Sequence, residues 1–338
     1  MRQSAALLLL LLLSGLPGAL TAETIRLATF NTDLSRKGPG LLLRDLQRDN
    51  AQIDAVIDTI RRADADILAL QSIDWDYDTA ALAALQLRLA EAGQHYPYRF
   101  APKPNAGIAS GQDLDGDGRL GEPEDAWGWG RFTGQSGIAL LSKYPITTEQ
   151  AIDLTGLLWH EVPDHRMPVT KDGLPYPDAE TAKMLRLSST SHWAVPVMLP
   201  DDMPLWVMSF HAAPPVFDGP EDRNGRRNAD ELLIWLHLLD GTLGARLTPP
   251  FVLLGDANND PARGEGHKDA LSRLLTDPRL QDTLPADENG LQHTVTWEST
   301  GPMRVDYALP SAELQVAASG IIRGKGSRHG LIWIDIRR

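Results

Sequence analysis

Two kinds of apolar pattern alternate along the first half of the chain. Apolar side chains recur at intervals of three and four through residues 51–63, which predicts an amphipathic helix. Residues 65–71 instead form a continuous apolar run, which is typical of a buried strand. The pattern therefore predicts helices and strands in alternation.

The same reasoning extends along the rest of the chain. Further helices are predicted over 79–92 and 228–239. Strands are predicted over 25–31, 65–71, 137–146, 184–189, 192–199, 205–211, 250–255, 304–310 and 330–336. Two stretches rich in Gly, Pro and Asp, 101–136 and 159–182, are predicted to be surface insertions in a single α/β core, and no repeat is visible.

The first 22 residues have the layout of a secretory signal peptide. Arg2 precedes an unbroken leucine run over 7–13, and small residues follow as far as Ala22. Cleavage there predicts a secreted or periplasmic domain over 23–338; an uncleaved anchor is the alternative.

Composition narrows the class of protein. The chain is 42% hydrophobic and has 9 Trp, enough for a sizeable core. It has no Cys, so it forms no disulfide and carries no lipid-linked N-terminal cysteine. Its formal net charge of −13 repels polyanions and attracts divalent cations.

Polar side chains collect where the predicted apolar strands end. Strand ends are where a sheet presents functional groups to a cleft. Hard oxygen ligands beside imidazoles suit a divalent cation, a phosphate and a general base. The residues in question are Asn31, Asp33, His211, Asp256, Asn258, Asp306 and His329.

In their order and spacing these segments resemble the endonuclease/exonuclease/phosphatase superfamily. The matching pieces are TFNTD, ILALQ, GIALLSKYPI, SFH, LLGDANNDP, RVDYALPS and SRHGLIWIDI, spread from residue 25 to residue 336. The resemblance implies a four-layer α/β sandwich of two packed, mostly antiparallel sheets flanked by helices. It also implies an enzyme that hydrolyses phosphoester bonds with Mg²⁺ or Mn²⁺.

The resemblance also implies a role for each strand-end residue. Asn31 and Asp33 would hold the metal or its water. The catalytic residues would be His211, Asp256, Asn258, Asp306 and His329. Among these, Asp256 would position or deprotonate the attacking water, and Asp306 would hold the imidazole of His329.

This sequence departs from the family pattern at two positions. Ser72 follows LQ, where the family normally has a metal-binding Glu, and Arg328 stands where the family has Asp before the last His. Arg328 could replace a bound cation as a phosphate clamp, because guanidinium binds phosphate with two hydrogen bonds.

Three explanations of Ser72 remain open at the level of sequence. Strand side chains alternate, so Asp74 shares the face of Ser72 and is the predicted substitute ligand, with Asp76 as another candidate. Alternatively the metal site is degraded, or it is rebuilt around Arg328.

Residues 113–124, DLDGDGRLGEPE, match the calcium loop of an EF-hand. Gly118 falls at position 6, where the backbone must turn sharply. The flanking segments are not helical, so we expect a bare Ca²⁺ loop inside an insertion. The predicted ligands, at positions 1, 3, 5, 7 and 12, are Asp113, Asp115, Asp117, Arg119 (through its carbonyl) and Glu124.

Basic residues follow the rigid segment after His211. Arg223 and Arg227 are predicted to bind substrate phosphate; pairing with nearby acidic residues is the alternative. We therefore expect an exported, monomeric phosphoester hydrolase with no stable protein partner. Its substrate would be a nucleic acid, a phosphorylated small molecule or a lipid head group. The competing hypothesis is a calcium-stabilised, non-catalytic protein that binds phosphorylated ligands.

Overall fold

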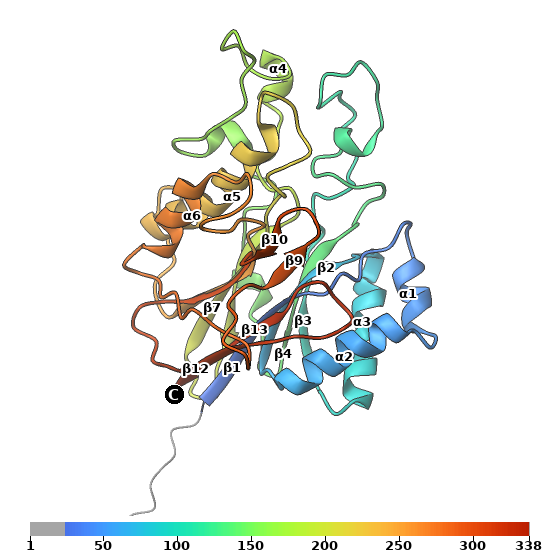
Figure 1. Cartoon of the computed structure of the whole chain (residues 1–338), viewed down its shortest axis with the longest axis vertical. Coiled ribbons are helices and arrows are strands. Elements are labelled where there is room, and N and C mark those ends of the chain that lie inside the picture. The colour runs from blue at the N-terminus through green and yellow to red at the C-terminus, as the bar shows by residue number, and fades with distance from the viewer. Residues whose placement is uncertain (1–23, 338) are drawn as a thin grey trace, which may run out of the picture.

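The computed structural model describes residues 24–337, which form two packed sheets with helices on both outer faces (Figure 1). The expected leader, residues 1–22, lies outside the described residues. Among residues 24–337 no helix is both long enough and apolar enough to cross a bilayer.

The first sheet has the strand order β12–β13–β1–β2–β4–β3. β1 and β2 run parallel, and every other neighbouring pair is antiparallel. Its strands are β1 (Thr24–Asn31), β2 (Ile67–Ile73), β3 (Tyr98–Phe100), β4 (Gly137–Ser142), β12 (Val316–Ile322) and β13 (Leu331–Arg337).

The second sheet has the order β11–β8–β7–β6–β5, with β7 and β8 parallel and the other pairs antiparallel. A separate hairpin, β9–β10, lies beside it. The strands are β5 (Ile152–Asp153), β6 (His192–Met198), β7 (Pro204–His211), β8 (Phe251–Asp256), β9 (Val295–Trp297), β10 (Gly301–Met303) and β11 (Asp306–Pro310).

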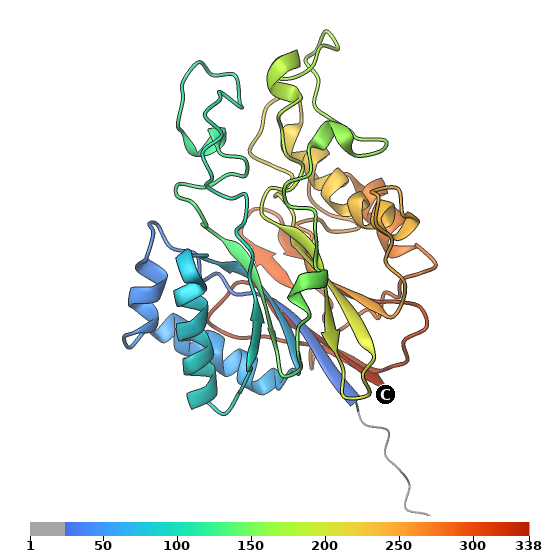
Figure 2. The same ribbon diagram turned by 180° about the vertical axis from the view of Figure 1, so that it is seen from behind.

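Helices cover the outer face of each sheet. On the first sheet lie α1 (Leu41–Leu46), α2 (Ala51–Ala63) and α3 (Ala80–Glu91). On the second lie α5 (Arg223–Asp240) and α6 (Lys268–Leu275), while the short α4 (Ala179–Ala182) lies in a loop (Figures 1 and 2). The expected four-layer sandwich of mostly antiparallel sheets is thereby confirmed.

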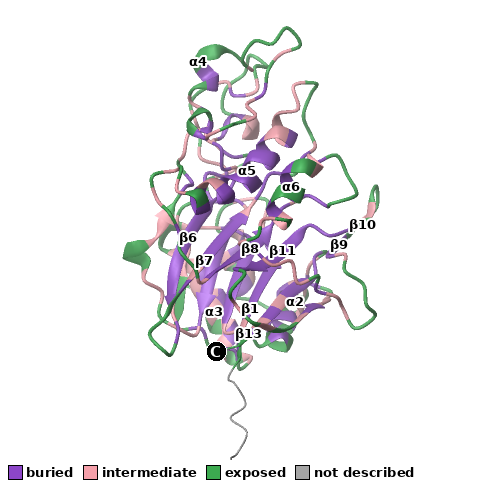
Figure 3. Ribbon diagram, turned by 90° about the vertical axis from the view of Figure 1, so that its left-hand side faces the viewer, coloured by how far each residue is buried: buried purple, intermediate pink, exposed green. Residues whose placement is uncertain are grey.

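The core lies in three layers, one between the sheets and one under each set of helices (Figure 3). α2 illustrates how the sequence specifies this packing. Asn50 caps its start by accepting hydrogen bonds from the backbone N–H groups of Gln52 and Ile53. The apolar positions at intervals of three and four are all buried against β-sheet residues, because they share one helical face.

One predicted strand is wrong. Residues 184–189 form turns and bends, and Arg186 makes only an isolated bridge with Leu158. The apolar residues there, Leu185 and Leu187, are buried against the second sheet's helical layer without joining a ladder. Burial alone therefore produced the apolar pattern.

The two predicted loop regions lie at the same end of the sandwich. Residues 101–136 and 159–182 contain only short helical turns and isolated bridges, and both rise from that end in opposite views (Figures 1 and 2). The carboxyl ends of β1, β7 and β8 point toward this end of the sandwich. The loops therefore surround the edge where the polar residues collect.

Candidate active site

Three side chains of the second sheet lie in one row across adjacent strand ends. β7 and β8 run parallel and end at His211 and Asp256, which are register partners. β11 runs antiparallel to β8 and starts at Asp306, whose partner is again Asp256. The hydrogen-bond register therefore brings together residues that are far apart in the sequence.

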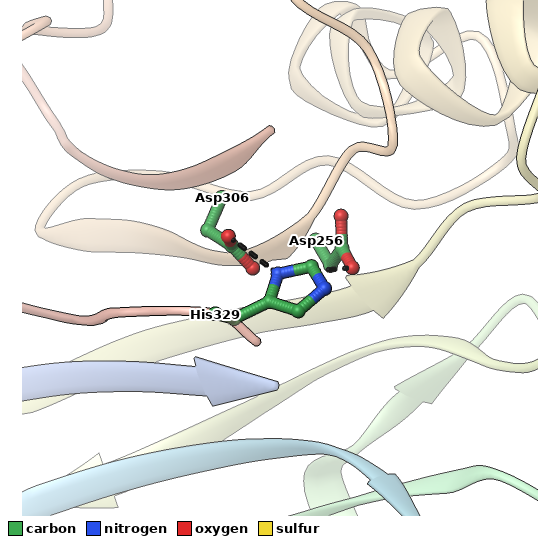
Figure 4. A group of neighbouring side chains, drawn as sticks. All are labelled: Asp256, Asp306 and His329. Atoms are coloured by element: carbon green, nitrogen blue, oxygen red, sulfur yellow. Dashed lines mark hydrogen bonds and ion pairs between the residues drawn. The ribbon is translucent and has the colours of Figure 1, made fainter. Parts of the chain in front are cut away.

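His329 joins this row from the loop before β13. Its Nδ1 lies 2.8 Å from Oδ2 of Asp306 and 3.9 Å from Oδ2 of Asp256 (Figure 4). All three residues are buried, and the His329 ring meets Trp297 edge-on with 5.8 Å between centroids. A carboxylate at Nδ1 fixes the orientation of the ring, so the predicted Asp306–His329 pairing is present.

The surroundings of His329 and Asp256 prepare both for proton transfer. Burial by itself lowers the pKa of His329, but Asp306 and then Asp256 outweigh it and raise that pKa to about 9. Burial, with a further contribution from Asp306, holds the pKa of Asp256 well above its ordinary value. At neutral pH the site presents an imidazolium beside a carboxylate that readily accepts a proton.

His211 has the opposite charge state. Burial, helped by the positive charge of His329, lowers the pKa of His211 to about 4, so its ring is neutral at neutral pH. Its Nε2 lies 3.5 Å from Oδ2 of Asp256. Its Nδ1 is buried and has no hydrogen-bond partner within residues 24–337. A neutral ring of this kind can donate a hydrogen bond to a phosphate oxygen without adding a formal charge.

Asn258 lies two residues after Asp256 in a left-handed backbone conformation, with φ 48°. Its backbone N–H donates to Oδ1 of Asp256 at 2.8 Å, and its Nδ2 donates to the carbonyl of Ala212 at 2.9 Å. Asn tolerates this conformation better than most residues. The turn thus fixes the Asp256 carboxylate and places the amide in the cleft wall.

His211, Asn258 and His329 line a cleft of about 1290 Å³, and the buried Asp256 and Asp306 contact His329 from behind this lining. The walls of the cleft come from the insertion that precedes β4 and from the loop after β7. The start of α5 and the hairpin β9–β10 complete them. Small-molecule sites typically enclose ~300–1,000 Å³. The cleft is therefore larger than a single phosphate group requires.

On the first-sheet side of the cleft, Arg328 is paired with the acidic residue Asp33. The carboxylate of Asp33 accepts hydrogen bonds from Nη2 of Arg328 at 2.7 Å, from its Nε at 2.9 Å and from its backbone N–H at 3.0 Å. Burial would raise the pKa of Asp33, but these bonds lower it, so the carboxylate stays charged. The Arg328 guanidinium also lies 4.7 Å from the centroid of Trp297.

Asn31 is likewise engaged with protein groups. Its Nδ2 donates to Oδ2 of Asp256 at 2.8 Å, and its Oδ1 accepts from the backbone N–H of Asp33 at 3.2 Å. The amide therefore links the two sheets at the floor of the cleft. The side-chain oxygen of Asn31 and both carboxylate oxygens of Asp33 each already accept at least one hydrogen bond.

The structure corrects the argument that Asp74 replaces the missing ligand. The β2–β4 register shifts between Leu70 and Ile73, and Ser72 has φ 54°, which marks a bulge. Strand alternation therefore does not carry past Ser72. Asp74 instead accepts hydrogen bonds from the backbone N–H groups of Arg36 (2.8 Å) and Ser136 (3.0 Å), and from a serine hydroxyl. It ties loops together and does not line the cleft, whereas Ser72 does.

A group that could hold an ion does exist at the second sheet. Asp256, Asp306 and His329 bring one ligand atom each within 4.8 Å of one another. However, Nδ1 of His329 and Oδ2 of Asp306 already bond to each other. On the first-sheet side the donors are a hydroxyl, an amide and a carboxylate neutralised by Arg328. This donor set does not fit a hard divalent cation, which needs several anionic oxygens, and we derive no step through one.

The acidic loop has part of the predicted calcium geometry. Asp113, Asp115 and Asp117 bring one carboxylate oxygen each within 4.8 Å of one another. Gly118 has φ 87°, as the sharp turn at position 6 requires, and its N–H donates to Oδ2 of Asp113 at 2.8 Å.

The end of that loop differs from the expectation. Glu124 is not in the acidic group; its Oε1 accepts from Nε1 of Trp129 at 3.0 Å, and it lines the cleft. The Arg119 guanidinium forms ion pairs within the loop. The neighbouring Asp125, which is buried, closes the loop by accepting from the N–H of Leu114 at 2.9 Å.

Arg223 and Arg227 lie one turn apart at the start of α5, and both line the cleft. The helix starts five residues earlier than predicted, so both belong to it. Sequence reasoning missed Trp297, on which both His329 and Arg328 pack. The short alternating run with Ser, Thr and Gly at its turn was the available signal for that hairpin.

Comparisons with known proteins agree with this geometry. The Endonuclease/Exonuclease/phosphatase family model matches residues 28–329. No curated protein sequence matches the chain significantly.

Solved structures share the fold at low sequence identity. An endonuclease/exonuclease/phosphatase from Beutenbergia cavernae is 18% identical, with TM-score 0.59, 93% of this chain and 71% of that chain covered. A family protein from Leptotrichia buccalis is 15% identical, with TM-score 0.54 and coverages of 93% and 100%. The human Nocturnin catalytic domain, solved with a bound sulfate anion, is 16% identical, with TM-score 0.52 and 93% of both chains covered.

The family model spans nearly all of the described residues, including the second sheet, most of the first sheet and the row of strand-end side chains. Its members are hydrolases of phosphoester bonds. The chain therefore belongs to the endonuclease/exonuclease/phosphatase family.

Proposed function

We propose that this chain is an exported phosphoester hydrolase whose proton transfers are carried by Asp256 and His329. The observation that carries the proposal is the 2.8 Å contact between His329 and Asp306, with Asp256 beside them on the adjacent strand. A histidine held by one carboxylate can act as the acid, and a second, protonatable carboxylate beside it can act as the base.

In the proposed reaction a water oxygen attacks phosphorus, and the ester P–O bond breaks. Asp256 takes the proton of the attacking water, because burial holds its pKa high. The imidazolium of His329 gives its proton to the departing ester oxygen, and Asp306 stabilises its charge. His211 and Asn258 donate hydrogen bonds to phosphate oxygens from the cleft wall.

Arg328 is the proposed phosphate clamp on the first-sheet side. Its guanidinium lines the cleft and is held by Asp33 and the face of Trp297. A planar guanidinium can bind two phosphate oxygens at once, which matches the geometry of a phosphoester. Mg²⁺ or Mn²⁺ dependence, as the family resemblance implies, stays a prediction, and the donors described above argue against it.

Ca²⁺ is proposed only for the acidic loop, where it would bind Asp113, Asp115 and Asp117. Three converging carboxylates repel one another, and a bound Ca²⁺ would remove that repulsion. Because Leu114 and Glu124 of the same loop line the cleft, such an ion would also stabilise one cleft wall.

The substrate classes remain those expected from the sequence: nucleic acid, phosphorylated small molecule or lipid head group. Export rests on the sequence of residues 1–22, and a monomer without a stable protein partner is the expected state. The non-catalytic alternative is not favoured, because a decayed site would not be expected to keep the complete Asp256, Asp306 and His329 row.

The test is a hydrolysis screen of the purified mature protein on DNA, RNA, phosphomonoesters and sphingomyelin. The matched pair is His329→Ala and His95→Ala, since His95 is exposed before β3 and does not line the cleft. We expect at least one substrate to be hydrolysed by wild type and by His95→Ala but not by His329→Ala. Equal hydrolysis by both variants would contradict the proposal.

A further inference from the structure

Arg227 is a buried cation without a polar partner. Only 7% of the residue is exposed, and its Nε has no hydrogen-bond partner within residues 24–337. The Arg227 side chain forms no hydrogen bond or ion pair in that range; its guanidinium lies 5.2 Å from the ring of Trp159. Leaving a charged group buried and unpaired is strongly destabilising. Because Arg227 lines the cleft, the arrangement favours an anion bound there.

The nearest acidic residue does not supply that anion. Glu231 lies one turn further along α5, but its oxygens accept from the N–H (2.6 Å) and hydroxyl (2.7 Å) of Ser189 and from the N–H of Ala213 (2.6 Å). Burial raises the pKa of Glu231 to about 7, so its charge is only partial near neutral pH. The same burial lowers the pKa of Arg227 only to about 10, so the guanidinium stays charged.

A second arginine points to the same space. Arg223 lies four residues before Arg227 on the same helical face, and both line the cleft. Its Nη1 donates to the carbonyl of Leu114 at 2.8 Å, which anchors it, while its Nε is buried without a partner. In a chain with formal net charge −13, two adjacent cations facing one cleft concentrate positive potential there.

This pair is separate from the catalytic row. The row comes from the ends of β7, β8 and β11 and from the loop before β13, whereas both arginines come from the start of α5. His329 and the two arginines therefore reach one cleft from different elements of the fold.

We propose that Arg227 and Arg223 form a second anion-binding centre. The substrate then carries, besides the phosphoester that is cleaved, a second phosphate-type group. This inference rests on the proposed function, because it concerns the same cleft. It narrows the substrate class to compounds with two separated anionic groups, such as bisphosphates or short polyanions.

The test is isothermal titration with inorganic phosphate, which can occupy both centres at once. We expect two binding events for wild type and one for Arg227→Gln. Arg226→Gln is the matched control: Arg226 is the adjacent residue, faces Asp222 and does not line the cleft, so two events should remain. His329→Ala should lose the other event and keep the one that depends on Arg227.

Two results would overturn the inference. One is unchanged phosphate binding, in number and affinity, in folded Arg227→Gln. The other is a single event in wild type that His329→Ala removes. If Arg227→Gln does not fold, Arg223→Gln decides the question: we expect at least tenfold weaker binding at the second centre, and unchanged binding would overturn the inference. Phosphate binding is measured without turnover, so the titration can be interpreted even if the hydrolysis screen fails.

Discussion

The two sides of the cleft floor differ in the charged groups that they carry. At the second sheet, Asp256, Asp306 and the loop residue His329 form a buried row in which His329 is hydrogen-bonded to Asp306 and lies 3.9 Å from Asp256. On the first sheet, a bulged serine and an arginine–aspartate pair stand where the family resemblance implied carboxylate ligands. Proton-transfer groups are present on one side, and a fixed guanidinium is present on the other.

A bound cation would normally perform two functions that are here divided between the two sides. A cation in a phosphate site stabilises negative charge and also activates water. Here positive charge comes from Arg328 and from the imidazolium of His329, while a carboxylate with a raised pKa can accept the proton of water.

Removing the proton-transfer pair should have the largest effect. His329→Ala and Asp306→Asn should each lower turnover by ~10²–10⁴-fold, the range that general acid–base catalysis supplies. The measurement is turnover on the best substrate of the screen, with circular dichroism as the check on folding. Near-native turnover in folded His329→Ala would remove the assignment.

The pH profile should sharpen the assignment of the same side. The pKa of His329 is raised to about 9, so its proton is present at neutral pH and is lost as the pH rises through that value. Activity should therefore fall on the alkaline side near pH 9. Asp306→Asn removes the main charge that raises this pKa, so the residual activity should fall at lower pH. An alkaline limb that does not move would mean that another group titrates.

On the other side, Asp74 should matter for stability rather than for ion binding. Its carboxylate accepts from Arg36, Ser136 and Ser35. Asp74→Asn replaces one acceptor by a donor and should lower the free energy of unfolding by ~1–3 kcal/mol. Denaturant unfolding measures this, with the exposed Asp78→Asn as control. A loss of Mg²⁺ response without a loss of stability would instead support the original assignment of Asp74 as a ligand.

The calcium loop should give the smallest effect. Ca²⁺ at ten times its dissociation constant stabilises the native state by about 1.4 kcal/mol, so the melting temperature should rise by a few degrees. Asp113→Ala should remove the difference between calcium and chelator, whereas Asp172→Ala in the other exposed loop should keep it. Identical melting of wild type in calcium and in chelator would exclude this site.

The parts of the site that follow from strand pattern could be predicted from the sequence. Asp256 and Asp306 end or begin apolar runs, and strand register then brings them together. The helical face of α2 followed equally directly from its spacing. In each case local periodicity determines which way a side chain points.

The parts that depend on distant contacts could not be predicted. The bulge at Ser72 leaves no mark in the apolar pattern, yet it invalidates strand parity and with it the placement of Asp74. Arg328 and Asp33 are 295 positions apart in the sequence, so their ion pair requires the folded sandwich. The buried run at 184–189 shows the converse, because apolar residues there pack without forming a strand.

The most direct measurement of the central claim compares wild type and Arg328→Ala in chelator and in Mg²⁺ or Mn²⁺, on the same phosphoester. If the guanidinium supplies the positive charge, wild type should keep its rate in chelator. Arg328→Ala should lose at least ~10-fold, and added metal should not restore it. Arg61→Ala, on the exposed face of α2, is the matched control. Loss of wild-type activity in chelator, restored by Mg²⁺ or Mn²⁺ and indifferent to Arg328→Ala, would contradict the account.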